Sequence, residues 1–189
     1  TFYRTTRTEY ESFFPYRYDQ AALDMGVAVS SDLRLVGEYG LETDLTVDTT
    51  SGGLDSTYWN AGFVYEPDER NSLEARTGER FFGTSYFFSF RHRARYLTLR
   101  AGYSENPTTN NNRRVGFDED LPPGEIPDFP DFPDSGETAA EPFISKRATA
   151  AASYEGSRSV VTLSFTDEEQ DYIQTTRVVD TRDWTLSYN

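Results

Sequence analysis

The sequence predicts an all-β fold, an antiparallel up-and-down transmembrane β-barrel that occupies residues 1–189 as one domain. Three observations lead to this fold class. Segments of roughly ten residues alternate between apolar and polar side chains, which is the period of a strand and the length that a tilted strand needs to cross a bilayer. Aromatic residues gather at the segment ends, and the face opposite the apolar one carries charged residues among Gly, Ser and Thr.

The composition agrees with this class. The mean hydropathy is -0.70, and no run of about 20 apolar residues offers a spanning helix. In a barrel only alternate residues meet lipid, so a low mean hydropathy is expected. The net charge of -14 argues against nucleic-acid partners, which need clustered Lys and Arg. The chain has no Cys, which excludes disulfide frameworks and thiol nucleophiles.

The N-terminal part of the chain predicts three strands. Residues 1–14 are rich in Thr, Tyr and Phe and are assigned a strand on that composition. Residues 23–30 and 33–41 both place their apolar side chains at odd positions, and Ser31-Asp32 between them is a plausible tight turn. The pair therefore predicts a β-hairpin.

The later strands follow the same alternation and are separated by turn-forming residues at 66–71, 92–95 and 155–158. We expect strands over 59–65, 79–91, 96–104, 147–154, 160–166 and 183–188. Without the segment 1–14, which rests on composition alone, the total is about eight, a number that is typical of a small barrel and also fits part of a larger one.

Residues 105–142 break the alternation with prolines and many carboxylates, so we expect a long acidic loop there. Short turns together with a long connection are typical of barrels with short periplasmic turns and long extracellular loops. The connection over residues 42–57 does not fit, because strict up-and-down order puts it at the short-turn end. Either a strand is missing from this assignment or one periplasmic turn is long.

A soluble β-sandwich also alternates, so period alone does not exclude a soluble carbohydrate-binding domain. The aromatic strand ends and the strongly polar opposite face favour the barrel. The two classes differ in what covers the apolar face, which is lipid in a barrel and a second sheet in a sandwich.

No motif for catalysis or cofactor binding stands out. His92 is the only imidazole and lies between Arg91 and Arg93, so we expect a solvated turn residue. Glycine-rich nucleotide motifs are absent, and pairs of carboxylates are unspecific among 32 acidic residues. We therefore expect no enzyme, no cofactor and no metal. The acidic residues of the long loop lack EF-hand spacing; they are Asp118, Glu119, Asp120, Asp128, Asp131 and Asp134.

The candidate functional residues are charged side chains on the polar face, which are expected to line the lumen. They are Arg34, Glu38, Glu79, Arg80, Arg91, Arg100 and Arg147. The arginines would favour anionic solutes or an acidic polysaccharide, because fixed charge sets pore preference. Alternatively, Glu38, Glu74 and Glu79 neutralise the arginines and fill a narrow barrel, because eight strands leave an interior just filled by side chains.

Two blocks of sequence resemble a known family. Residues 71–86, which contain Gly-Glu-Arg-Phe-Phe-Gly at 78–83, continue through 91–95 and 103–105 and are similar to the Gly-x-Arg-[Tyr/Phe]-Phe-Gly signature of outer-membrane proteins associated with the PEP-CTERM/exosortase system. These proteins are related to barrels encoded in exopolysaccharide operons. The second block runs from 143–147 through 156–158 to 161–164.

This resemblance covers roughly residues 58–170 and implies a barrel in the outer membrane of a Gram-negative bacterium, with a role in the cell envelope and no established activity. The chain departs from the family in its acidic Pro-Asp-Phe loop, where the family has an apolar one. Family members are also longer and end on an aromatic residue, so we expect this chain to be a piece of a longer protein.

These observations leave three functional hypotheses. The first is a porin-like or export component for exopolysaccharide or surface proteins. The second is a structural or adhesive anchor whose acidic loop binds a partner, and the third is the soluble carbohydrate-binding domain. The expected partners are outer-membrane lipid and either polysaccharide or envelope assembly proteins.

Overall fold

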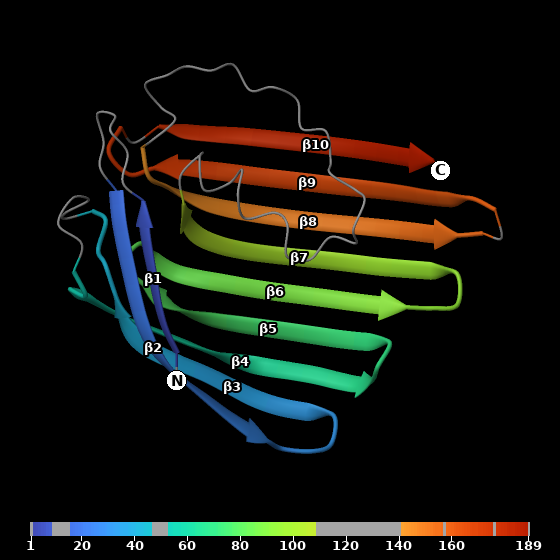
Figure 1. The fold of residues 1–189 in the computed structure, drawn as a ribbon, viewed down its shortest axis with the longest axis horizontal. Coiled ribbons are helices and arrows are strands. Elements are labelled where there is room, and N and C mark those ends of the chain that lie inside the picture. Colours follow the sequence, from blue (N-terminus) through green and yellow to red (C-terminus); the bar gives the residue numbers. More distant parts are fainter. Residues whose placement is uncertain are drawn as a thin grey trace.

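The computed structural model describes residues 2–8, 16–46, 53–108, 141–156, 158–175 and 177–188. They form one antiparallel sheet in which ten strands lie side by side in chain order (Figure 1). The strands are β1 (Phe2–Thr8), β2 (Tyr16–Ala28), β3 (Leu33–Glu42), β4 (Ser56–Asp68), β5 (Asn71–Arg80), β6 (Gly83–Arg93), β7 (Leu97–Thr108), β8 (Phe143–Glu155), β9 (Val160–Tyr172) and β10 (Val178–Tyr188).

The predicted all-β, up-and-down arrangement is confirmed, but the predicted closure into a barrel is not observed. Each strand pairs with its sequence neighbours, and in the described part of the chain β1 and β10 are the two free edges of the sheet. The strand number is ten and not about eight, because the count of eight leaves out β1, which rested on composition alone, and because β5 was not predicted.

Four short connections lie at one end of the sheet, which we call the turn end. They join β2 to β3, β4 to β5, β6 to β7 and β8 to β9, and Figure 1 shows them together on the right. The opposite end, the loop end, carries the connection from Glu42 to Ser56 and the one from Thr108 to Phe143. The connection over residues 42–57, which the predicted strand order put at the short-turn end, therefore lies at the loop end, because the predicted order lacked β5.

Strand β5 also corrects the predicted strand over 79–91. Arg80 pairs with Gly83 across a two-residue turn at Phe81-Phe82, so Glu79 ends one strand and Thr84 belongs to the next. Gly83 adopts φ of 113°, a conformation that L side chains rarely adopt. A hairpin therefore forms where the sequence alone suggested a continuous strand.

Gly83→Ala should destabilise the protein by about 1–2 kcal/mol, because a Cβ strains the backbone at positive φ. A Cβ at Gly83 would meet no atom within 4 Å, so the loss of stability would come from backbone strain and not from a steric clash. Gly37→Ala is the control, since a Cβ there makes an ordinary contact of 3.6 Å with the Asn60 carbonyl oxygen. Urea unfolding measures both variants, and equal losses would contradict the role given to Gly83.

The two faces of the sheet differ sharply. One face, the apolar face, carries Leu23, Met25 and Val27 of β2 and continues across the registered pairs to Leu163 and Leu186 at the far side. The other, the polar face, holds most of the buried strand residues, among them Tyr18, Glu42, Tyr58 and Glu168, so it is the inner side of the curl. Within the described residues no second sheet or helix lies on the apolar face.

The sheet curls most strongly at the loop end. Leu45, which follows β3, and Tyr18 of β2 form a small core against which Phe81 and Ile173 pack. Ile173 follows β9, and six strand spacings in a flat sheet would put β3 and β9 about 29 Å apart. This contact therefore requires the sheet to roll toward a cylinder at that end.

Candidate functional site

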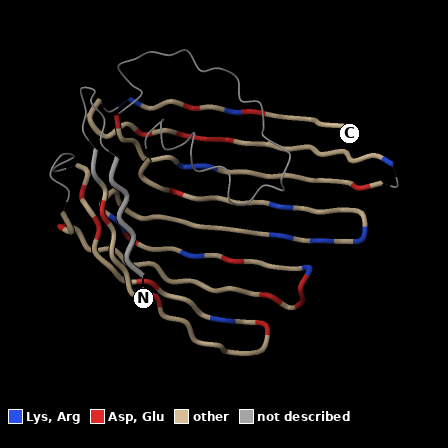
Figure 2. The backbone as a smooth tube through the Cα atoms, in the orientation of Figure 1, with Lys and Arg blue, Asp and Glu red and all other residues tan. Residues whose placement is uncertain are grey.

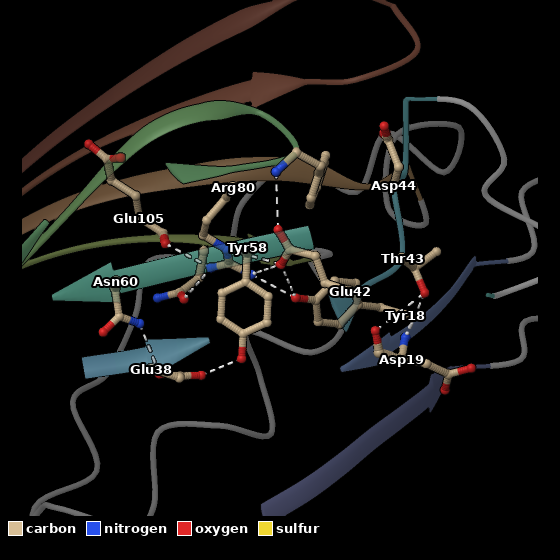
Figure 3. Close-up of polar contacts among 12 residues, drawn as sticks. Tyr18, Asp19, Glu38, Glu42, Thr43, Asp44, Tyr58, Asn60, Arg80 and Glu105 are labelled. Carbon is tan, nitrogen blue, oxygen red and sulfur yellow. Dashed lines mark hydrogen bonds and ion pairs between the residues drawn. The ribbon is translucent and has the colours of Figure 1, made fainter. Parts of the chain in front are cut away.

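The most deeply buried charge on the polar face is the Glu42 carboxylate, at the loop end of β3 (Figure 3). This side chain is 0% exposed. Its Oε2 accepts hydrogen bonds from the Tyr18 hydroxyl at 2.7 Å and from Arg80 Nη2 and Nε at 2.6 and 3.1 Å, and its Oε1 accepts one from the Phe81 N–H at 3.1 Å. Four donors therefore compensate for the loss of hydration of this carboxylate.

Arg80 connects strands that are far apart in the sheet order. Its Nη2 donates to the Tyr18 hydroxyl of β2 at 2.6 Å, and its Nη1 donates to the Asn106 Oδ1 of β7 at 3.4 Å. Its guanidinium also lies over the rings of Tyr58 and Phe82, at 5.8 and 5.2 Å. Because β2 and β7 would lie about 24 Å apart in a flat sheet, this side chain crosses the space inside the curl.

A second group of contacts extends the network toward the turn end. Glu38, two residues before Gly40 on β3, accepts a hydrogen bond from the Tyr58 hydroxyl and another from Asn60 Nδ2 at 2.9 Å. Arg76 of β5 pairs with Glu74 at 2.5 Å and lies 3.9 Å from Glu38. We call the set Tyr18, Glu38, Glu42, Tyr58, Asn60, Arg76 and Arg80 the inner network.

The far side of the polar face is also hydrogen-bonded. Glu168 of β9 is 2% exposed and accepts from the Ser145 hydroxyl at 2.9 Å, and Gln170 accepts from the Tyr172 hydroxyl at 3.2 Å. Between this side and the Phe81-Phe82 turn lies a shallow cavity of about 370 Å³. The loop end is thus filled mainly by side chains.

Six of the seven residues predicted to line a lumen lie on the polar face, and one does not. Glu79 pairs with Trp59 and Thr84 on the apolar face, because the hairpin at Phe81-Phe82 changes the alternation. Glu38 and Arg80 join the inner network. Arg147 lies opposite Ser104 and Glu168, and Arg34 lies opposite Val64.

Arg91 and Arg100 face each other directly across β6 and β7 near the turn end. Of the arginines predicted to be neutralised, Arg80 pairs with Glu42, which is not one of the predicted carboxylates, while Glu38 and Glu74 contact Arg76 instead. The described residues offer Arg91 and Arg100 no carboxylate within salt-bridge distance. Figure 2 shows Lys and Arg along the turn-end halves of β6 and β7 and in the turn that joins them.

Sequence reasoning missed Tyr18, Glu42, Tyr58, Asn60 and Arg76. Glu42 shares the alternation of Glu38, so extending the predicted strand by one residue would have found it. Arg76 was hidden with the rest of β5. Tyr18 carried no signal, since its partner Arg80 is 62 residues away in the chain.

His92 lies on β6, where its Nδ1 is 2.5 Å from the Asn71 Oδ1. In the described part of the chain no group of three His or acidic residues is placed to hold a metal, and the acidic residues at 118–134 lie outside that part. Among the same residues, no helix is sufficiently long and apolar to cross a membrane.

Comparison with protein-family models, with curated proteins and with solved structures finds no match to this chain. The resemblance of residues 58–170 to an outer-membrane family stays a prediction.

Proposed function

We propose that this chain forms a transmembrane β-barrel of a bacterial outer membrane, in which β1 and β10 join. The observation that carries the proposal is the apolar face. Among the described strand residues, every exposed large hydrophobic side chain except Phe87 lies on it. Met25 is 55% exposed and Leu186 is 71% exposed, although both belong to a continuous apolar surface. Lipid is the environment that such a surface fits.

The apolar face forms a band that crosses the strands. On β7 and β8 it runs from Leu97 to Tyr103 and from Tyr154 to Ala148, and seven residues of strand are about 23 Å long. Toward the loop end the same face turns charged, with Glu105, Lys146, Asp167, Glu169 and Arg182. An apolar band bounded by charge is typical of outer-membrane barrels.

The register supports closure. A line drawn through paired residues from Phe2 of β1 passes Ala22 and Thr108 and reaches position 177, at the loop end of β10. A shear of about 12 residues for ten strands gives a strand tilt of about 40°, within the range of known barrels. With that shear the seven residues of β1 lie opposite the last seven residues of the chain. The whole length of β1 then pairs with β10.

The same shear explains the inner network. Relative to the line through Ala22 and Thr108, Tyr18 lies four residues toward the loop end and Asn106 lies two residues toward the turn end. Their offset along the strands is therefore six residues over the five steps from β2 to β7. This is the offset that brings side chains to the same height in a barrel of that shear. Arg80 then bridges opposite walls at one level of the lumen.

For the role of the barrel, a porin-like or export component for polysaccharide or surface proteins is the first candidate, because the turn-end half of the polar face carries the exposed residues Arg34, Arg91, Arg93 and Arg100. The second candidate is a structural anchor, which the inner network favours because it fills the loop-end half. Single-channel conductance in planar bilayers separates them.

Heat-modifiable migration tests the barrel itself: the folded protein should migrate differently in unboiled and boiled gels. Closure is tested by disulfide trapping, for which the absence of native Cys gives a clean background. Thr6→Cys paired with Thr185→Cys should oxidise readily, because directly opposed strand residues have the Cα spacing that a disulfide needs.

The matched control for trapping is Thr6→Cys with Trp184→Cys, because Trp184 lies on the opposite face. Pairing Thr6→Cys with Asp183→Cys or Ser187→Cys samples the two neighbouring registers. Absence of a cross-link in all three inward pairs would refute closure between β1 and β10.

A further inference from the structure

Three arginines near the turn end of the polar face stand out by their lack of acidic partners. Arg91 of β6 and Arg100 of β7 are a directly opposed pair, and Arg93 lies two residues beyond Arg91 on the same face. All three side chains are exposed. In the described part of the chain none of them lies within 4.0 Å of a carboxylate, although the protein carries 32 acidic residues.

Three cations on the adjoining strands β5 and β8 are neutralised. Arg76 and Arg80 pair with Glu74 and Glu42, and Lys146 pairs with Glu169 at 2.6 Å and with Asp171 at 2.7 Å. Like charges directly opposite each other destabilise a sheet. The Arg91 and Arg100 pair therefore carries a repulsion that an acidic residue at either neighbouring position would remove.

The neighbours of the pair are small. Ser72 lies opposite Arg91 on β5, and Ala151 lies opposite Arg100 on β8. Both arginines are exposed, and the Cβ atoms of a directly opposed pair lie about 5 Å apart. Both can therefore reach one anionic group, or two adjacent ones on a single molecule.

We propose that Arg91 and Arg100, assisted by Arg93, form a binding site for an anion bearing carboxylate or phosphate oxygens. The guanidinium fork matches both groups with two parallel hydrogen bonds, and binding removes the repulsion between the arginines. The inference rests on the proposed barrel, in which this face lines the lumen and the site opens toward the turn end. A molecule that carries such groups at intervals would meet this site first when it enters from that end.

The experiment is calorimetric titration of the folded protein in zwitterionic detergent at low salt. Inorganic phosphate and tetragalacturonate, a chain of four uronic acids, are the two anionic probes, and maltotetraose is the uncharged one. We expect wild type to bind at least one anionic probe and not maltotetraose. Binding of phosphate but not tetragalacturonate would identify a phosphate site, and the reverse result would identify a carboxylate site.

Arg91→Gln and Arg100→Gln should each weaken binding about tenfold or more, because each removes charged hydrogen bonds. Arg182→Gln is the matched control, since Arg182 is also an exposed arginine but lies on the apolar face, where it pairs with Asp167 at 3.1 Å. It should change affinity less than about twofold. Equal weakening in all three variants would overturn the site in favour of unspecific attraction.

The outcomes also separate this site from the barrel. If wild type shows a heat shift but binds neither anionic probe, the proposed barrel stands and the proposed anion site is refuted. If wild type shows no heat shift, the barrel itself is refuted. Heat shift of each variant verifies that it folds before its affinity is compared.

Discussion

Arg80→Met is expected to destabilise the folded protein by about 3–5 kcal/mol, because it leaves the buried Glu42 carboxylate without its charged partner. Glu42 is 0% exposed and would keep only the Tyr18 hydroxyl and the Phe81 N–H as donors. Met retains much of the aliphatic volume, so the loss reports on charge and hydrogen bonds more than on packing. Urea unfolding in detergent, followed by tryptophan fluorescence, measures the change.

Two further variants make this result decisive. Arg182→Met removes an exposed ion pair with Asp167 on the apolar face and should change stability by about 0–1 kcal/mol. Adding Glu42→Gln to Arg80→Met should recover much of the loss, because no buried charge is then left unpaired. A loss at Arg80 no larger than that at Arg182 would contradict the buried network.

The same variant has a readout in planar bilayers. Because Arg80 reaches both β2 and β7 inside the curl, its truncation should raise single-channel conductance if the barrel is a passage. Arg182→Met should leave conductance unchanged. A barrel that stays closed to ions in wild type and in Arg80→Met would favour the structural anchor.

Leu163→Arg is the second change with a large expected effect. Leu163 lies in the middle of the apolar residues of β9 and is 45% exposed. Charge on the lipid face of a barrel costs about 2–4 kcal/mol near the bilayer midplane. We therefore expect Leu163→Arg to reduce folding into lipid vesicles strongly, as measured by the heat-shifted fraction in gels.

Ser164→Arg is its matched control, because Ser164 is the next residue and faces the other side of the sheet. In the proposed barrel it enters the lumen and should fold nearly as well as wild type. In a water-soluble sheet the order would reverse, since an exposed Leu tolerates Arg. Normal folding of Leu163→Arg would therefore refute a lipid-facing surface.

The alternation of side chains made much of this fold predictable. The hairpin of β2 and β3 keeps the predicted faces, with Val27 opposite Leu35 and Leu23 opposite Tyr39. Strands with strong apolar positions, such as β7 and β9, were found for the same reason. A period of two is visible wherever one face meets an apolar environment.

Strand β5 was missed because its apolar face is weak. Leu73 is followed at alternate positions by Ala75, Thr77 and Glu79, so hydropathy hardly varies along the strand. The Phe81-Phe82 turn carries aromatic residues where turns usually carry Asn, Asp or Gly, and only Gly83 marks it.

The inner network could be predicted only in part. Glu38 and Arg80 follow from alternation, but their partners depend on how strongly the sheet curls, and that curvature brings Tyr18 to Arg80 across 62 residues. Local patterns do not encode such long-range approach.

In the proposed barrel, the free edges of β1 and β10 have a consequence for insertion into a membrane. Before they join, each edge presents a row of unpaired N–H and C=O groups, beside an apolar surface that is exposed to water. In an aqueous compartment such a chain is prone to aggregate by edge-to-edge pairing. A barrel of this kind therefore calls for a holding chaperone that shields both features until β1 pairs with β10 in lipid.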